Sequence, residues 1–396
     1  MRNIKAFLIA LVLSIISAVG ILNYVSDTLP KYSIDYGTWM DESKYACVKG
    51  ITEVLSEDQT IPIFGSSELR HGMNSKYHAK AVFRNTDMRP FLIGQAGYQS
   101  LTHTMTMGAV GNSIKEKKAV LIVSPQWFKI GGVKKTAFGA SFSEDAFIEF
   151  LKNDNISADN KNEMIQRVRQ LTKSNKEMNR KINHDVAWYY KGQEGLVTTP
   201  RKEVHNFLVV GKSRSKLILR KKVLLEKDNK EAKETKETIG TVEEPDWNKL
   251  KEKAEKRGKI VSRNNGFGMY DSIYEKSYHQ YVEGKKKLKK VNYDYNSVEF
   301  KDLELFIKIC KDLNVEPMVV ILPYNGRWYD YMGLKKEERK AYYKKVNTLL
   351  DKYKVKRSDL SNKEYASYYF RDNSHLLLKG LVDLNEHIYN FYEFDQ

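Results

Sequence analysis

The sequence predicts an α/β fold in which a parallel β-sheet is packed between helices. Short apolar runs recur along the chain, and segments with helical periodicity separate them. Each run is continuously apolar rather than alternating, which is typical of strands buried on both faces of a parallel sheet. The chain has 396 residues, of which 41% are hydrophobic, so it can form one large domain with insertions or two smaller ones. Alternating strands and helices of this kind indicate an α/β sandwich.

The first predicted element is a membrane-spanning helix. Arg2 and Lys5 precede an uncharged, almost wholly apolar segment at 6–22, and the next charge is Asp27. A bilayer core requires roughly 20 such residues, with a lower limit of about 17. We therefore predict a transmembrane signal anchor at residues 1–26.

The alternative to an anchor is a cleaved signal peptide, for which Ala18-Val19-Gly20 is a candidate cleavage site. The apolar run is long for a signal peptide, which favours the anchor. Basic residues ahead of the span predict a cytoplasmic N-terminus, a single pass through the cell membrane and an extracytoplasmic domain at 27–396.

The strands and helices of that domain follow in order. A tether and a first helical stretch are expected at 27–59. Strands are expected at 61–64, 91–94, 119–123 and 317–322, with a weaker one at 353–356, and helices at 297–313 and 336–353. Proline is poorly tolerated inside a central strand, so Pro62 is expected at the first residue of its strand.

A helical insertion at about 141–290 interrupts this alternation. Residues 153–171 are polar and helical, and 213–259 is rich in Lys and Glu at helical spacing. Such a charged run is usually a solvated helix face or a mobile insertion.

The charge of the chain suggests a polyanionic partner. Its formal net charge is +17, and basic proteins bind polyanions. The predicted topology excludes nucleic acid, which leaves an anionic membrane surface and phosphate-rich wall polymers such as teichoic acids. The alternative is that the lysines keep a tyrosine-rich surface soluble.

The two cysteines, Cys47 and Cys310, have no metal-ligand spacing. They form either a single disulfide or, the favoured interpretation, two buried apolar positions. No metal and no cofactor are expected.

Two short motifs indicate nucleophilic catalysis. Gly65-Ser66-Ser67-Glu68 follows an apolar strand and opens a helical segment, where free backbone N–H groups can hold an oxyanion. Asp372 and His375 are three residues apart, so a carboxylate can orient an imidazole. A serine hydroxyl needs such a base to become a useful nucleophile. Either motif alone is weak, since Gly-Ser-Ser turns and Asp-x-x-His pairs also occur without catalysis.

Together the motifs resemble the SGNH (GDSL-type) hydrolase superfamily, a three-layer sandwich around a parallel sheet. The resemblance makes Ser67 the nucleophile of a triad with His375 and Asp372, although Ser66 replaces the superfamily's aspartate. It places the oxyanion hole at Ser67, at Gly97 after the second strand, and at Gln126 after the third. Gln126 stands there in place of an asparagine.

With Ser66 and Gln126 at these two positions, the chain resembles one branch of the superfamily, the DltD family of D-alanyl-lipoteichoic acid biosynthesis proteins. The matching segments are Ile63–Leu69, Phe91–Leu101, Val123–Phe128, Asn264–Gly268, Leu322–Asp330 and Asp372–His375. This resemblance implies D-alanyl transfer to lipoteichoic acid through an acyl-enzyme. It implies a membrane-bound O-acyltransferase as partner, and a D-alanyl carrier protein acting through an intermediary.

Several points stay open on the sequence. The same triad serves an esterase or thioesterase, and a non-enzymatic scaffold that binds teichoic acid is the third hypothesis. Asn325, Trp328 and Trp127 are expected to line the substrate cleft, or else to be core residues. The remaining histidines near the motif, His71, His78 and His103, are expected to be hydrogen-bonded or surface residues rather than second bases.

Overall fold

The computed structural model describes residues 2–234, 243–287 and 296–393 of the chain. Its centre is a five-stranded, wholly parallel sheet with the strand order β2-β1-β3-β4-β5. The strands are β1 (Thr60–Phe64), β2 (Arg89–Ile93), β3 (Lys118–Val123), β4 (Glu316–Ile321) and β5 (Lys356–Asp359). The predicted α/β class is confirmed.

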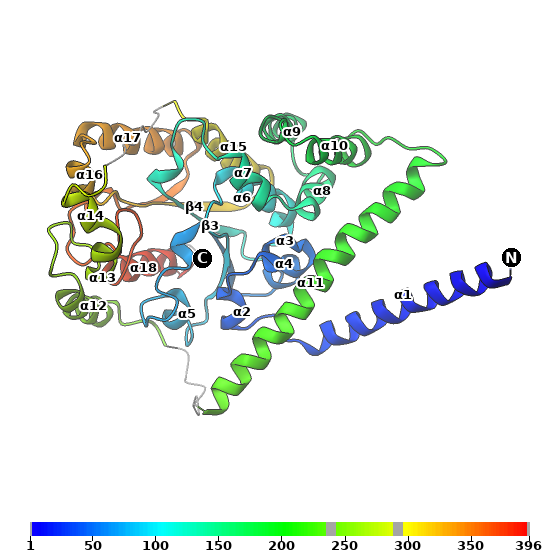
Figure 1. Ribbon diagram of the computed structural model, residues 1–396, viewed down its shortest axis with the longest axis horizontal. Coiled ribbons are helices and arrows are strands. Elements are labelled where there is room, and N and C mark those ends of the chain that lie inside the picture. Colours follow the sequence, from blue (N-terminus) through cyan, green and yellow to red (C-terminus); the bar gives the residue numbers. More distant parts are fainter. Residues whose placement is uncertain (1, 235–242, 288–295, 394–396) are drawn as a thin grey trace.

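Helices cover both faces of this sheet and make it the middle of three layers (Figure 1). Alternate residues of β1 show the division, since Phe64 packs into one core and Ile61 and Ile63 into the other. The helices of the first layer are α4 (Val48–Leu55), α6 (Ser100–Val110), α15 (Glu299–Asp312) and α17 (Lys336–Tyr353). Those of the second are α5 (Ala79–Val82), α12 (Trp247–Val261) and α18 (Lys379–Glu393).

Two details of the sheet differ from the expectation. Pro62 is the third residue of β1, not the first, and it is paired with Phe91 of β2. The N–H of Gly65 points to β2, so strand alternation turns the nitrogen of Pro62 toward β3, whose pairing with β1 begins only at Ile63. The missing N–H therefore breaks no ladder bond.

The last strand lies three residues beyond its predicted start. Tyr353 is the last residue of α17, and Lys354 terminates that helix in a left-handed conformation with φ of 54°. The apolar residues near 353 therefore belong to the helix end, and β5 begins at Lys356.

Between β3 and β4, where the sequence predicts a helical insertion at about 141–290, the chain forms a series of helices that begins at Lys135. Its helices are α7 (Lys135–Ser141), α8 (Glu144–Lys152), α9 (Ala158–Thr172), α10 (Lys176–Asp185), α11 (Thr198–Glu234), α12, α13 (Asp271–Ile273) and α14 (His279–Val282), with π-helical turns at Val186–Tyr190 and Tyr274–Tyr278. Much of the charged run is regular helix that buries Leu217 and Ile218. Residues 235–242 of that run lie outside the described residues.

The chain begins with the long helix α1 (Arg2–Thr28), which projects from the body of the molecule (Figure 1). Its segment Ile4–Thr28 is long and apolar enough to cross a membrane, a test that signal sequences also pass. It leads into α2 (Ile34–Thr38) and α3 (Glu42–Ala46). Cys47 and Cys310 are both buried and free.

The remaining short elements position side chains near the strand ends. They are α16 (Gly326–Tyr331) and 3-10 turns at Ser67–Leu69, Gly111–Ser113, Pro125–Trp127 and Ser361–Lys363.

Candidate active site

The residues predicted to form the nucleophile and the oxyanion hole lie at the carboxyl edge of the sheet. Ser67, Gly97 and Gln126 follow β1, β2 and β3, which are neighbours with β1 in the middle. The strand order reverses beside β1, and ligands of open α/β sheets bind at such a switch point.

The turn after β1 holds Ser67 at the start of a 3-10 turn. The carboxylate of Glu68 accepts a hydrogen bond from the N–H of Ser66 at 2.5 Å, and the Ser66 hydroxyl donates to the carbonyl of Gln95 at 3.2 Å. A Cβ at Gly65 would lie 2.8 Å from Oε1 of Glu68. Glu68 therefore acts within the turn, and its burial raises the pKa of its carboxyl.

Gly94 lets the turns after β1 and β2 approach each other. It has a φ of 138°, and a Cβ there would lie 1.9 Å from the carbonyl oxygen of Gly65. Only glycine combines this conformation with this contact.

The second motif forms a tight loop rather than a helical turn. An antiparallel bridge joins Phe370 to Leu376, and the N–H of Arg371 donates to the carbonyl of His375. Inside the loop one oxygen of Asp372 accepts the backbone N–H groups of Ser374 and His375, each at 2.9 Å. The carboxylate is thus fixed by the backbone that carries the imidazole.

A continuous chain of hydrogen bonds connects the two motifs. Nδ1 of His375 lies 2.8 and 2.9 Å from the carboxylate oxygens of Asp372, and Nε2 lies 2.7 Å from Oγ of Ser67. Because an ionised carboxylate only accepts, Nδ1 carries the hydrogen and Nε2 is free to accept from the serine. Ser67 is half-buried, and its hydroxyl can be deprotonated by His375 as it attacks an electrophile.

The charge of Asp372 is stabilised in this setting. Burial favours the neutral carboxyl, but the hydrogen bond and charge of His375 and the two backbone N–H groups outweigh it and lower the pKa of Asp372 to about 2. Asp372 is therefore ionised at neutral pH, and its charge would stabilise the imidazolium formed when His375 takes a proton from Ser67.

A second imidazole lies against the first. The ring centroids of His71 and His375 are 4.1 Å apart, and the guanidinium of Arg371 lies 3.1 Å from Nδ1 of His71. Burial, followed by the charges of His375 and Arg371, lowers the pKa of His71 to about 4, so His71 is neutral at pH 7. Arg371 was not singled out from the sequence, although it directly precedes the Asp-x-x-His motif.

The other two histidines act within the fold. His78 is buried, accepts the N–H of Lys80 at Nδ1, and so donates from Nε2 to the carbonyl of Leu69. His103 is fully buried against Phe64, and burial lowers its pKa to about 3.

The three side chains expected to line the cleft, Asn325, Trp328 and Trp127, are all buried. The amide of Asn325 donates to the carbonyl of Asp372 at 3.3 Å and accepts the N–H of Trp328. Trp328 packs edge-on against Phe267 and Tyr278, and the hydroxyl of Tyr278 donates to Asn373 beside the imidazole loop. Asn325 therefore supports the Asp372 loop directly, through its hydrogen bond to the loop backbone. Trp328 supports the loop indirectly, by packing against Tyr278, which donates to Asn373.

A basic cavity of about 710 Å³ adjoins the imidazole loop. Arg371 precedes Asp372 and Leu377 follows His375 by two positions, and both line it. The cations of its wall are Lys76, Lys253, Lys256, Arg257 and Arg371. The cavity therefore places positive charge beside the loop that carries Asp372 and His375.

Comparison with known proteins identifies the family of the chain. The family model described as "DltD protein" matches residues 42–393. The chain is 30% identical to Protein DltD of Bacillus subtilis (strain 168) over 345 residues, which cover 86% of this chain and 84% of the relative. It is 29% identical to Protein DltD of Staphylococcus aureus (strain NCTC 8325 / PS 47) over 344 residues, 85% of this chain and 82% of the relative. It is 26% identical to Protein DltD of Lacticaseibacillus rhamnosus over 359 residues, 86% and 78% of the two chains. Since the family model spans most of its length, the chain belongs to the DltD family.

Proposed function

We propose that this protein transfers D-alanyl groups to lipoteichoic acid through an acyl-enzyme on Ser67. The observation that carries the proposal is the hydrogen-bonded chain Ser67–His375–Asp372 at the carboxyl edge of the sheet. Membership of the DltD family supports D-alanyl as the group transferred and lipoteichoic acid as the acceptor.

In the first half-reaction Oγ of Ser67 attacks the carbonyl carbon of a D-alanyl ester, while Nε2 of His375 takes the hydroxyl proton. The tetrahedral intermediate collapses, and His375 returns the proton to the leaving alcohol. In the second half-reaction a glycerol hydroxyl of the polymer gives its proton to His375 and attacks the alanyl-enzyme. Ser67 then leaves with that proton, and the polymer carries the ester.

The oxyanion of both intermediates needs donors, which we assign to the N–H groups of Ser67 and Gly97 and the side-chain amide of Gln126. In the described part of the chain the N–H groups of Ser67 and Gly97 donate to no protein acceptor. Gln126 is half-buried, and its amide likewise has no acceptor among the described residues. Removing one such donor typically lowers the rate by about 10²–10³.

The basic cavity beside the loop is suited to the phosphates of the acceptor. Its five cationic side chains would attract a polyglycerol phosphate, and no acidic side chain lines it among the described residues. We assign a structural role to Asn325, Trp328 and Trp127, because all three are buried. They would hold the loops of the site in place rather than contact the substrate.

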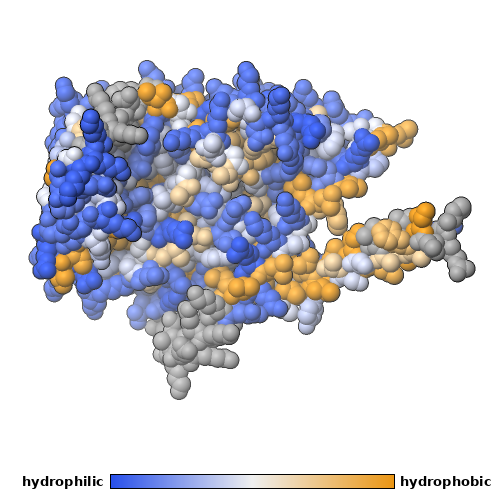
Figure 2. Space-filling model, viewed as in Figure 1, coloured by the Kyte–Doolittle hydropathy of each residue, from blue (hydrophilic) through white to orange (hydrophobic). Residues whose placement is uncertain are grey.

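The apolar helix α1 supports action at the membrane. The helix α11 that lies near it exposes Val204, Phe207, Leu208, Leu219 and Val223, and apolar surface follows both helices in Figure 2. Lysines and arginines on α11 favour an anionic membrane surface. With the N-terminus in the cytoplasm, the domain acts outside, so it receives D-alanine from a membrane-bound O-acyltransferase and only indirectly from the carrier protein.

The second candidate is an esterase or thioesterase with the same residues. It is favoured by the partial exposure of Ser67 and His375, which leaves the acyl-enzyme accessible to water. Incubation of the protein with a D-alanyl ester, with and without lipoteichoic acid, separates the two. Label on the polymer supports transfer, whereas equal release of free D-alanine with or without polymer supports hydrolysis. A scaffold would give neither product.

A further inference from the structure

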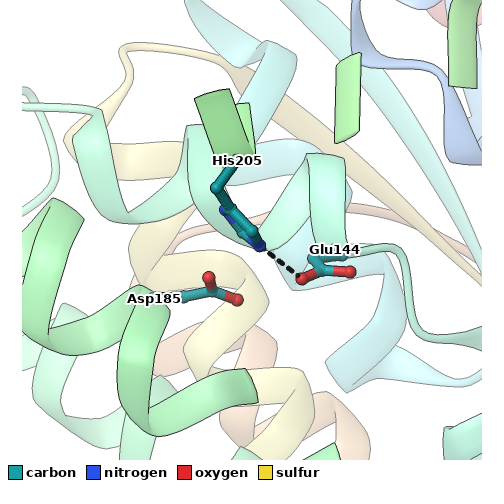
Figure 3. A group of neighbouring side chains, drawn as sticks. All are labelled: Glu144, Asp185 and His205. Carbon is teal, nitrogen blue, oxygen red and sulfur yellow. Dashed lines mark hydrogen bonds and ion pairs between the residues drawn. The ribbon is translucent and has the colours of Figure 1, made fainter. Parts of the chain in front are cut away.

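A second cluster of ionisable side chains lies in the helical insertion. Glu144 begins α8, Asp185 ends α10 and His205 lies in α11 (Figure 3). One nitrogen or oxygen atom from each residue lies within 4.8 Å of the other two. The three residues come from separate helices, so no sequence spacing indicates the cluster. None of them is on an element that carries Ser67, Asp372 or His375.

The hydrogen bonds of His205 direct its Nε2 toward the carboxylate of Glu144. The hydroxyl of Tyr189 donates to the carbonyl of Lys202, so its oxygen can only accept from Nδ1 of His205, at 3.3 Å. Nδ1 therefore carries a hydrogen, and Nε2 faces Oε1 of Glu144 at 3.2 Å. Two acceptors at this distance need a cation between them, either a proton or a metal ion.

Asp185 supplies a second, independent indication of a ligand. It is fully buried, and neither carboxylate oxygen has a hydrogen-bond partner among the described residues. Figure 3 shows its carboxylate directed toward His205 and Glu144. A buried, unpartnered carboxylate is costly, and a bound cation would remove that cost.

We propose that Glu144, Asp185 and His205 bind one divalent transition-metal ion, for which Zn²⁺ fits best. Imidazole nitrogen and carboxylate oxygen are both Zn²⁺ ligands, with bond lengths of about 2.0–2.2 Å. The side chains of Glu144 and His205 are 26% and 28% exposed, so they can move the short distance needed to close around the ion and admit water as a further ligand. The hydroxyl of Tyr189 would orient the imidazole from behind, as outer partners of metal-bound histidines do.

The ion would connect three helices of the insertion. It would tie α11 to α8 and α10, and α11 also contacts α1, α2, α3 and α4. Metal binding at this cluster would therefore stabilise the packing of α11 against α8 and α10, next to the predicted membrane helix α1. It has no part in the acyl transfer proposed for Ser67.

The experiment uses the full chain in detergent, stripped of metal with a chelator and titrated with ZnCl₂. The wild-type protein is expected to take up one equivalent saturably, and Asp185→Asn and His205→Gln are expected to lose that equivalent. His279→Gln is the matched control, because His279 also pairs with a glutamate, Glu275, but on an exposed surface without a buried carboxylate. It is expected to bind Zn²⁺ as the wild type does.

Thermal unfolding of the same proteins gives a second readout. Without metal, Asp185→Asn is expected to unfold at or above the wild-type temperature, because a neutral amide costs less free energy to bury than an unpartnered carboxyl group that is ionised in the unfolded chain. With saturating Zn²⁺ the order reverses, since only the wild type gains stability by binding. The proposal is overturned if the wild type shows no saturable Zn²⁺ uptake, or if Asp185→Asn binds Zn²⁺ like the wild type. Native circular dichroism of each variant ensures that a lost equivalent reflects the ligand rather than misfolding, and neither readout depends on acyl transfer.

Discussion

Asp372 sets the direction of proton transfer at the candidate active site. Its carboxylate receives the Nδ1 hydrogen of His375 and two backbone N–H groups, so only Nε2 is left to face the serine. At the scale of single residues this tautomer is the feature on which the proposed chemistry depends.

The first prediction concerns that tautomer. In Asp372→Asn the amide can donate a hydrogen to Nδ1, so Nε2 then carries the proton and cannot accept one from Ser67. Turnover of a D-alanyl ester should fall by about 10⁴, as for other triads that lose this carboxylate. The matched control is Asp351→Asn, an exposed aspartate paired with Arg357, which should retain wild-type turnover. Turnover within tenfold of wild type in Asp372→Asn would contradict the assignment.

The same carboxylate predicts a pH-dependent stability. Its pKa is about 2 in the folded protein, below the ordinary value of 3.8, so the folded state holds the ionised form. The resulting stability is present above pH 4 and is lost as the pH falls from about 4 toward about 2. Its size is on the order of 2 kcal/mol.

Chemical unfolding of the wild type and Asp372→Asn between pH 6 and pH 2.5 measures this contribution. The difference in the free energy of unfolding should shrink over the acidic part of the range. A difference that does not change with pH would show that the charge of Asp372 is not stabilised as proposed.

At the scale of elements, the turns after β1 and β2 depend on one close approach. Gly94→Ala would place a methyl group against the carbonyl of Gly65 in a backbone conformation that side chains rarely adopt. We expect a loss of at least about 2 kcal/mol in the free energy of unfolding, together with loss of activity. Gly139→Ala, in the exposed helix α7 with open space around it, should be neutral or stabilising. Equal unfolding free energies for the two variants would contradict this description of the turn.

The elements that could be predicted from the sequence are those whose burial leaves a pattern. β1, β3 and β4 are continuous apolar runs buried on both faces, so their positions were predicted within one or two residues. β5 has the sequence Lys-Arg-Ser-Asp at the edge of the sheet and buries only Ser358, so it has no apolar run to locate it. The apolar residues before it belong to the end of α17.

Only part of the candidate site could be predicted from the sequence, namely the part that local sequence patterns reveal. Asp372 and His375 are close in the chain, so local spacing indicated both. The strand before Gly65 indicated the turn that carries the nucleophile, and the resemblance selected Ser67 within it. The contact of His71 with Arg371 joins segments about 300 residues apart, and only the fold brings them together. Burial of Asn325 and Trp328 also depends on tertiary packing, which no local pattern reports.

At the scale of the whole molecule, the chain has a net charge of +17. We expect the part of this charge that lines the basic cavity to determine the affinity for the polymer. We expect the double variant Lys253→Glu, Arg257→Glu to raise KM for lipoteichoic acid by about tenfold or more, because it reverses two charges in the basic cavity. Cleavage of a small D-alanyl ester should be unchanged, since neither residue is in the hydrogen-bonded chain. Added salt should weaken polymer binding to the wild type more than to the variant.

Lys311→Glu provides the control for surface charge in general, as Lys311 is exposed on α15 outside the residues that line this cavity. It should leave KM for the polymer near the wild-type value. An equal rise of KM in both proteins would assign the effect to net charge rather than to the cavity.

The central claim is that Ser67 carries the D-alanyl group. Its most direct test is Ser67→Ala in cells that lack the wild-type copy, with the protein level matched by immunoblot and D-alanine ester measured in the cell envelope. Without the hydroxyl no acyl-enzyme forms, so the predicted ester content is that of cells without the protein. An ester content equal to wild type, at equal protein level, would contradict the claim.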